Sequence, residues 1–284
     1  MIPMREPFND ARRNLISSIV LAGSSQSCEV SVFFNDGLLR GNRAVKCDAS
    51  GFAAFSSPNH PPLATVGAAG VSAQNRHLWR PPPSSRLRIH SNLDARVVVV
   101  RLTPGFDDGA LVAMVQHTPN LRGLVLSLYG TGNGPSHKAA FVELIERAIE
   151  REIVVVAVTQ CFQGAVSLDT SVVVVWAVVS TDNERPPCLV RAPPTMAHVR
   201  RMDHRRRYEV GRRLLALGVV SAGDMTTEAC VTKLAYLCGR GLEFREVRAA
   251  MGRNLRGEIT EPGAASVTPM NAPMGMPMDR PLNL

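Results

Sequence analysis

Lys46 ends the segment LLRGNRAVK and follows two other cations, Arg40 and Arg43. A lysine that is crowded by cations or partly buried gives up its proton more readily than a solvated one, and can then shuttle protons. The preceding segment EVSVFF, residues 29–34, has the β-branched and aromatic residues that predict a strand. Proton transfer just beyond a strand is one interpretation of Lys46, and a solvated surface lysine is the other.

A glycine-rich loop, YGTGNGP, covers residues 129–135 between a predicted strand and a predicted helix. Free backbone N–H groups at such a place can bind an anion. The loop is not a dinucleotide fingerprint, because Pro135 stands where the third glycine is required. A binding loop and a tight structural turn are both open interpretations.

The triplet Thr159-Gln160-Cys161 ends another predicted strand, where ligands of open α/β sheets tend to bind. Packing is the competing interpretation of this cysteine. The six cysteines form no CxxC pair, and the spacing of Cys188, His198 and His204 matches no common zinc site, so no metal is expected. Without a secretory leader, we expect the thiols to be reduced and mostly buried.

Half of the net charge of +8 lies in residues 171–207, where seven arginines and three acidic residues together contribute +4. No aromatic platform accompanies this charge, so we expect no nucleic-acid partner. The longest apolar run, Ser171 to Val179, is shorter than the roughly 20 residues that span a bilayer. We therefore expect a cytoplasmic protein without a membrane partner.

The chain divides into a first part, a proline-rich linker and a regular second part. A helix is predicted over residues 13–23, and the prolines of residues 55–63 predict a loop. The second part alternates buried strands with helices; the strands are predicted at 96–102, 123–130 and 153–160, and the helices at 107–118 and 137–152. Because Val-rich strands alternating with amphipathic helices are typical of parallel sheets, we predict an α/β chain of two domains with mainly parallel sheets.

Eight segments together resemble the asparaginase family of the cytosolic type. They occur in family order and are IPMREPFNDARRNL, EVSVFFNDGLLRGNRAVK, FAAFSSPN, LATVG, YGTGNGP, IVVVAVTQC, GVVSAGDMTTEA with the following KL, and NLRGEIT. The resemblance covers most of residues 2–260. It implies residues 1–79 as the remainder of a first domain, 80–95 as linker and 96–260 as the second domain. A disordered tail is expected over 261–284.

The resemblance implies hydrolysis of L-asparagine to L-aspartate and ammonia without a cofactor. In the family, a threonine of a TGGTI-like motif attacks the amide, and a GTDT-like motif supplies a second threonine and an aspartate for proton transfer with a lysine. This sequence contains neither motif. Of the catalytic group only the lysine is matched, by Lys46. The first domain is therefore expected to be incomplete, N-terminally truncated, and the chain as written to be inactive.

Other expectations also depend on the resemblance. Asn133 of the glycine loop is expected to approach the substrate of a neighbouring subunit in a homo-oligomer, and Cys161 matches a cysteine of an asparagine-binding regulatory site in bacterial relatives. Residues 171–207 form an atypical insert, since joining Thr170 to Tyr208 restores the family pattern. Two alternatives remain, namely a non-catalytic amino-acid-binding chain and an amidotransferase subunit for transfer-RNA amidation.

Overall fold

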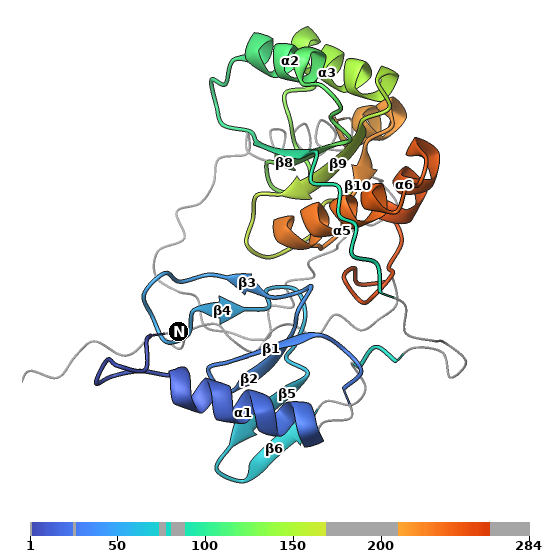
Figure 1. Ribbon diagram of the computed structural model, residues 1–284. Helices are drawn as coiled ribbons and strands as arrows, with labels where there is room; N and C mark the ends of the chain where they lie inside the picture. The colour runs from blue at the N-terminus through green and yellow to red at the C-terminus, as the bar shows by residue number, and fades with distance from the viewer. Residues whose placement is uncertain (1, 25–26, 74–77, 81–88, 169–209, 262–284) are drawn as a thin grey trace, which may run out of the picture. The chain divides into compact units, whose positions relative to one another are not determined.

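The computed structural model describes residues 2–24, 27–73, 78–80, 89–168 and 210–261 (Figure 1). The chain forms two compact units, one of Met1–Ser85 with Glu261–Leu284 and one of Arg86–Thr260. We call them unit 1 and unit 2 and describe each by itself. The division after Ser85 lies inside the expected linker. The expected insert of residues 171–207 and nearly all of the expected tail lie outside the described residues.

Unit 1 contains a four-stranded antiparallel sheet. Its strands are β1 (Ser31–Phe34), β2 (Gly37–Arg40), β5 (Ala64–Gly67) and β6 (Gly70–Ala73), in the order β1-β2-β5-β6. A two-residue turn joins β1 to β2, in which Asn35 and Asp36 have φ values of 45° and 64°. Asn and Asp tolerate this left-handed conformation, and a turn of this kind matches the twist of a hairpin. The strand predicted over 29–34 is thus confirmed, beginning two residues later.

Helix α1 (Ala11–Ser24) confirms the helix predicted over 13–23. Its Leu21 belongs to a buried cluster with Phe33 of β1 and Leu38 of β2. A second pair of short strands, β3 (Val45–Lys46) and β4 (Phe55–Ser56), forms an antiparallel ladder of its own. The expected loop over 55–63 therefore begins with two strand residues.

Unit 2 contains the predicted parallel sheet. Its strands are β7 (Val97–Arg101), β8 (Gly123–Leu128), β9 (Val154–Thr159) and β10 (Val220–Ser221), in the order β10-β9-β8-β7. Every pair in this sheet is parallel. The α/β class is confirmed, with parallel pairing in unit 2 and antiparallel pairing among the described strands of unit 1.

Helices cover both faces of the unit 2 sheet. On one face, α2 (Asp108–His117), α3 (Ala139–Glu150) and the helical residues 210–217 pack against alternate side chains of β8 and β9. On the other face lie α5 (Thr227–Gly239) and α6 (Phe244–Met251). The apolar face predicted for α3, namely Phe141, Leu144, Ile145 and Ala148, is buried. This covering explains why β8 and β9 are continuous apolar runs.

Strand β7 differs from the sequence-based prediction, which made it buried. It lies at the edge of the sheet, and Val99 is 43% exposed. An edge strand has one neighbour only, so a Val-rich run does not by itself distinguish it from a central strand. In the described part of the chain, no helix combines the length and the apolar character needed to cross a membrane.

Candidate functional site

Lys46 lies at the end of β3 with its side chain exposed. In the β3–β4 ladder it pairs with Phe55. Its Nζ atom lies 5.3 Å from the centroid of the Phe55 ring, a cation–π distance. The Phe55 ring in turn lies 5.0 Å, between centroids, from the buried ring of Phe34. The ammonium group is therefore held over an aromatic surface while it stays open to solvent.

A tight turn connects β2 to β3, the strand that ends at Lys46. The Arg40 carbonyl accepts from the backbone N–H groups of Arg43 and Ala44, both at 3.0 Å. The N–H of Gly41 donates to the carbonyl of Val30 at 2.9 Å. A Cβ atom at residue 41 would lie 2.8 Å from that carbonyl oxygen, so the close approach requires glycine. The RGNR segment therefore fixes where the chain enters β3.

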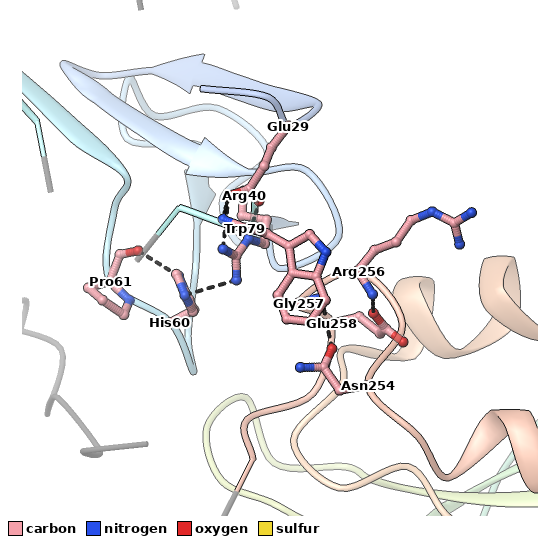
Figure 2. A network of polar contacts seen from close by, with 9 residues as sticks. All are labelled: Glu29, Arg40, His60, Pro61, Trp79, Asn254, Arg256, Gly257 and Glu258. Atoms are coloured by element: carbon pink, nitrogen blue, oxygen red, sulfur yellow. Dashed lines mark hydrogen bonds and ion pairs between the residues drawn. The ribbon is translucent and has the colours of Figure 1, made fainter. Parts of the chain in front are cut away.

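Arg40 is part of a buried polar network in unit 1 (Figure 2). Its guanidinium forms a two-armed ion pair with Glu29, in which Nη2 donates to Oε1 at 3.0 Å. The Nη1 atom lies 3.1 Å from Nε2 of His60, whose Nδ1 lies 2.7 Å from the Pro61 carbonyl. Because a carbonyl can only accept, Nδ1 donates and Nε2 accepts from Arg40. Glu29 also accepts from the backbone N–H of Trp79 at 2.5 Å.

This network corrects one expectation. Arg40 does not act as an uncompensated cation beside Lys46, because Glu29 neutralises its charge and both side chains are less than a tenth exposed. Arg43 is also buried, at 2% exposure, whereas Lys46 is exposed. The sequence spacing could not show this difference in burial, because the three residues lie within seven positions of one another.

An acidic group follows the lysine. Oδ1 of Asp48 accepts from the backbone N–H groups of Ser50 at 2.8 Å and Gly51 at 3.0 Å. The N–H groups of Gly51 and Ser50, with a smaller contribution from the Lys46 charge, hold the pKa of Asp48 below its usual value. This exposed carboxylate stays ionised at neutral pH.

The three lysines of the chain have different environments. Lys138 pairs with Asp108 at 2.9 Å and lies 5.0 Å from the centroid of the Phe106 ring. Lys233 is buried and pairs with Glu258 at 2.7 Å. Within the described residues, Lys46 forms no ion pair. Lys46 is thus the lysine that is exposed, lies over an aromatic ring and, within the described residues, forms no ion pair with a carboxylate.

A second candidate site lies at the carboxyl ends of β8 and β9 in unit 2. The Thr159 hydroxyl donates to the Gly130 carbonyl at 2.6 Å and accepts from the N–H of Cys161 at 3.0 Å. Asn133 closes the glycine loop through two backbone hydrogen bonds with Tyr129, at 2.8 and 2.9 Å. The structure therefore brings the loops of Asn133 and Cys161 to the same edge of the sheet, joined by a threonine whose role was not predicted.

The glycine loop requires its glycines. Gly130 and Gly132 have positive φ values of 52° and 120°. A Cβ at residue 132 would also meet side-chain atoms of Val166 and Leu168 at 3.2 and 3.3 Å. The interpretation as a structural turn therefore holds for the backbone. The side chain of Cys161 is exposed next to this turn.

A buried ion pair closes the carboxyl-terminal segment of unit 2. Lys233 of α5 donates to the carbonyls of Met251 and Arg253 as well as to Glu258. Glu258 accepts from the backbone N–H groups of Leu255 at 2.9 Å and Arg256 at 2.6 Å, and Figure 2 shows the second of these. The sequence segments KL and NLRGEIT contained both partners, but nothing in their spacing indicated that they pair.

The cysteines also differ from the prediction that most thiols are buried. Cys28, Cys47 and Cys161 are exposed, Cys230 and Cys238 are buried, and these five are thiols rather than disulfides. Cys188, His198 and His204, which were discounted as zinc ligands, lie outside the described residues. Among the residues that the structure does describe, no group of three His, Cys, Asp or Glu side chains could hold a metal ion.

Two family models match the chain, "Asparaginase, N-terminal" over residues 1–79 and "Glutaminase/Asparaginase C-terminal domain" over residues 96–183. The L-asparaginase of Thermococcus kodakarensis is 34% identical over 260 residues, which cover 92% of this chain and 66% of that protein. Its solved structure matches with a TM-score of 0.70 at 32% identity, with the same two coverages.

Relatives with other names are also similar. The 60 kDa lysophospholipase of Mus musculus is 33% identical over 262 residues, covering 92% of this chain and 39% of that protein. A glutamyl-tRNA(Gln) amidotransferase subunit of Aeropyrum pernix is 28% identical over 263 residues, covering 90% and 52%. The chain thus spans between about two fifths and two thirds of the length of these relatives. The family models, the identity to a named asparaginase and the shared fold agree: the chain belongs to the asparaginase family.

Proposed function

We propose that this chain supplies the proton-transfer lysine and the second domain of an asparaginase-type amidohydrolase, which converts L-asparagine and water to L-aspartate and ammonia. A threonine hydroxyl attacks the side-chain amide carbon, ammonia leaves, and water then releases aspartate from the acyl-threonine. Lys46 exchanges the protons that these steps require. The 284 residues contain neither threonine motif, so we propose that they do not turn over asparagine by themselves.

The observation that carries this proposal is the environment of Lys46. Lys46, which the resemblance matches to the lysine of the family, is exposed. It lies at a strand end, after a turn that requires Gly41. The other two lysines are committed to Asp108 and Glu258. A group that transfers protons to a bound substrate must be reachable, and Lys46 meets this condition.

The proposal is tested by restoring the two motifs. In the Thermococcus kodakarensis L-asparaginase, we take the segment that lies N-terminal to the residue matching Ile2. This segment is fused to the 284-residue chain. Purified fusion and purified chain are then assayed for release of ammonia from L-asparagine and from L-glutamine. We expect release by the fusion with asparagine and none by the chain alone. Release by the chain alone, or none by a folded fusion, contradicts the proposal.

A second candidate function, amino-acid binding without turnover, rests on the edge of the unit 2 sheet. Thr159 joins the Gly130 loop to Cys161, which is exposed. Carboxyl ends of parallel strands are where such sheets bind small ligands. Isothermal titration of the chain with L-asparagine separates the two candidates: binding by the chain with no turnover by the fusion favours a binding protein, whereas turnover favours the amidohydrolase.

We also propose that the protein is a homo-oligomer and that Asn133 approaches the substrate of a neighbouring subunit. The glycine loop supports this proposal because two backbone hydrogen bonds between Tyr129 and Asn133 hold it in place, and Asn133 is only partly buried. Asn133→Ala in the fusion should then raise KM more than it lowers kcat. An unchanged KM, or a monomer by sedimentation that retains full turnover, contradicts this assignment.

A further inference from the structure

A small pocket lies in unit 2 where the segment of residues 89–94 passes the end of helix α5. Its volume is about 300 Å³, and the residues that line it are Ile89, His90, Ser91, Asn92, Gly239 and Arg240. The backbone N–H of Asp94 holds the segment against α5 by donating to the Ala235 carbonyl at 3.0 Å. A Cβ atom at residue 239 would overlap with the Asn92 carbonyl oxygen, so the close approach requires glycine.

The ring of Tyr236 in α5 gathers basic side chains beside this pocket. The His90 ring lies edge-on to it, with 6.1 Å between the two centroids. Arg240, which follows α5, has its Cζ atom 5.8 Å from the Tyr236 centroid. The Cζ atom of Arg256 lies 5.0 Å from the same centroid, and its Nη2 donates to the Tyr236 hydroxyl at 3.2 Å. Two guanidinium groups and one imidazole therefore surround one aromatic ring.

The charge of Arg240 is available to a ligand. Its side chain is exposed, and among the residues that the structure describes it forms no ion pair. No described carboxylate lines the pocket. Asp94, just beyond the lining segment, is paired with Arg96 at 2.6 Å. The N–H donors of the Arg240 guanidinium are therefore not taken up by a carboxylate of unit 2.

We propose that this pocket binds a small oxyanion, which is a phosphate or a carboxylate group. Each polar side chain that lines it can donate a hydrogen bond. Arg240 offers the fork of N–H groups that matches two oxygens of a carboxylate or a phosphate. Asn92 offers an amide, Ser91 a hydroxyl and His90 a ring N–H. A pocket of donors beside a guanidinium favours an anionic ligand over a neutral or cationic one.

The size of the pocket indicates a small molecule. A volume of about 300 Å³ is at the lower end of the range of ligand sites. The one large apolar side chain in its lining is Ile89, whereas sites for drug-sized ligands are mostly apolar. The pocket shares no residue with the candidate sites of Lys46 and Cys161, so this inference does not depend on the proposed function.

The end of α5 opposes an anion, but its effect is the smaller one. The partial negative charge at a helix carboxyl end weakens anion binding by about 2- to 5-fold. Here the N–H of Arg240 already donates to the carbonyls of Tyr236 and Leu237, and that of Gly241 donates to the Cys238 carbonyl. A charge-assisted hydrogen bond strengthens binding by about 10- to 100-fold. The guanidinium therefore outweighs the helix end.

The test measures binding to the 284-residue chain by isothermal titration calorimetry, with inorganic phosphate and L-aspartate as separate probes. Arg240→Gln removes the cation of the pocket, and His90→Ala removes a donor from the facing segment. Arg245→Gln is the matched control, because Arg245 is an exposed arginine of α6 that does not line the pocket. All three residues are exposed, so the melting temperatures should stay within about 2 °C of the parent.

We expect saturable one-to-one binding of at least one probe, with a Kd of about 1 mM or below. Arg240→Gln should raise this Kd by about 10-fold or more and His90→Ala by about 3-fold, while Arg245→Gln changes it by less than about 2-fold. Binding of phosphate alone assigns a phosphate ligand, and binding of L-aspartate alone assigns a carboxylate. Absence of saturable binding of both probes overturns the proposal. So does binding that Arg240→Gln and His90→Ala leave unchanged, or that Arg245→Gln weakens as much as Arg240→Gln.

Discussion

The Nζ atom of Lys46 lies 5.3 Å from the centroid of the Phe55 ring, and the two residues are direct neighbours across the β3–β4 ladder. The ring packs against the buried Phe34. Because the position of Phe55 is fixed by this packing, the aromatic surface under Lys46 is fixed as well. The register of a two-residue ladder thus decides where the exposed ammonium group is held.

Removing the ring should weaken this support without removing the lysine. In the fusion, we expect Phe55→Leu to lower kcat by roughly 2- to 5-fold, since an exposed cation–π contact stabilises by about 0.5–1 kcal/mol. Phe55→Tyr should keep kcat within about 2-fold of the parent. The control is Phe106→Leu, which removes the ring beneath Lys138. Equal losses from Phe55→Leu and Phe106→Leu would show that the effect is not specific to Lys46.

The buried pair of Lys233 and Glu258 should dominate the local stability of unit 2. Glu258→Gln leaves a charged lysine with 7% side-chain exposure and no carboxylate partner. We expect a loss of about 3–5 kcal/mol in the free energy of unfolding, measured by urea denaturation. Glu143→Gln is the control, because Glu143 pairs with Arg147 on the surface of α3 and should lose less than about 0.5 kcal/mol. Similar losses for both variants would contradict the assignment.

The same pair sets a pH dependence. Burial raises the pKa of Glu258, but hydrogen bonds from Lys233 and the Leu255 and Arg256 N–H groups outweigh it, so the net shift is downward from 4.5. A carboxyl with a lowered folded pKa binds fewer protons when folded, so its stabilisation is present above pH 4.5 and is lost as the pH falls below it. Unfolding free energies measured between pH 7 and pH 3 should therefore decrease less steeply in Glu258→Gln than in the parent. A parallel decrease in both proteins would exclude this cause.

Thiol reactivity should divide the cysteines by burial. Burial raises the pKa of the Cys230 thiol to about 12, so this residue should not react with a thiol reagent at pH 8 until the chain unfolds. Cys28, Cys47 and Cys161 are exposed and should react in the folded protein. Peptide mass spectrometry after labelling with and without urea gives the modified fraction at each site. Labelling of Cys230 in the folded protein at the rate of Cys161 would contradict the packing of α5.

Thr159 should hold the second candidate site together. Thr159→Val removes the donor to the Gly130 carbonyl and the acceptor for the Cys161 N–H. We expect faster hydrogen exchange at Cys161 and a loss of about 1 kcal/mol of stability. Thr232→Val is the control, because among the described residues the Thr232 hydroxyl donates to carbonyls of its own helix, those of Glu228 and Ala229. Unchanged exchange at Cys161 in Thr159→Val would show that this threonine does not position the loop.

The sequence predicted unit 2 better than unit 1 for a physical reason. The apolar residues of α3 repeat with the period of a helix, and turns bound the apolar segments of β8 and β9. These local patterns determine which elements form. Strand order is not encoded in a local period, which is why β7 was expected to be buried. In unit 1, β3 and β4 have two residues each. Strands that short leave no detectable alternation.

The roles of the candidate site residues stay predictions. Lys46, Asn133 and Cys161 were assigned through the family resemblance, because residue types alone left a surface lysine, a structural turn and a packed cysteine open. Their supports could not be predicted, because Phe55 reaches Lys46 and Thr159 reaches Gly130 through contacts made only in the folded chain. The burial of Arg40 depends in the same way on Glu29 and His60, which lie 11 and 20 residues away.

The most direct test is the turnover of the fusion when each lysine is removed in turn. Lys46→Ala should lower kcat for L-asparagine by roughly 10²- to 10⁴-fold, as expected for a general acid–base group. Lys138→Ala, which removes a lysine that also lies over a phenylalanine ring but is paired with Asp108, should leave kcat within about 3-fold of the parent. If the fusion releases ammonia and Lys46→Ala leaves kcat unchanged, Lys46 is a surface lysine and the central claim is wrong.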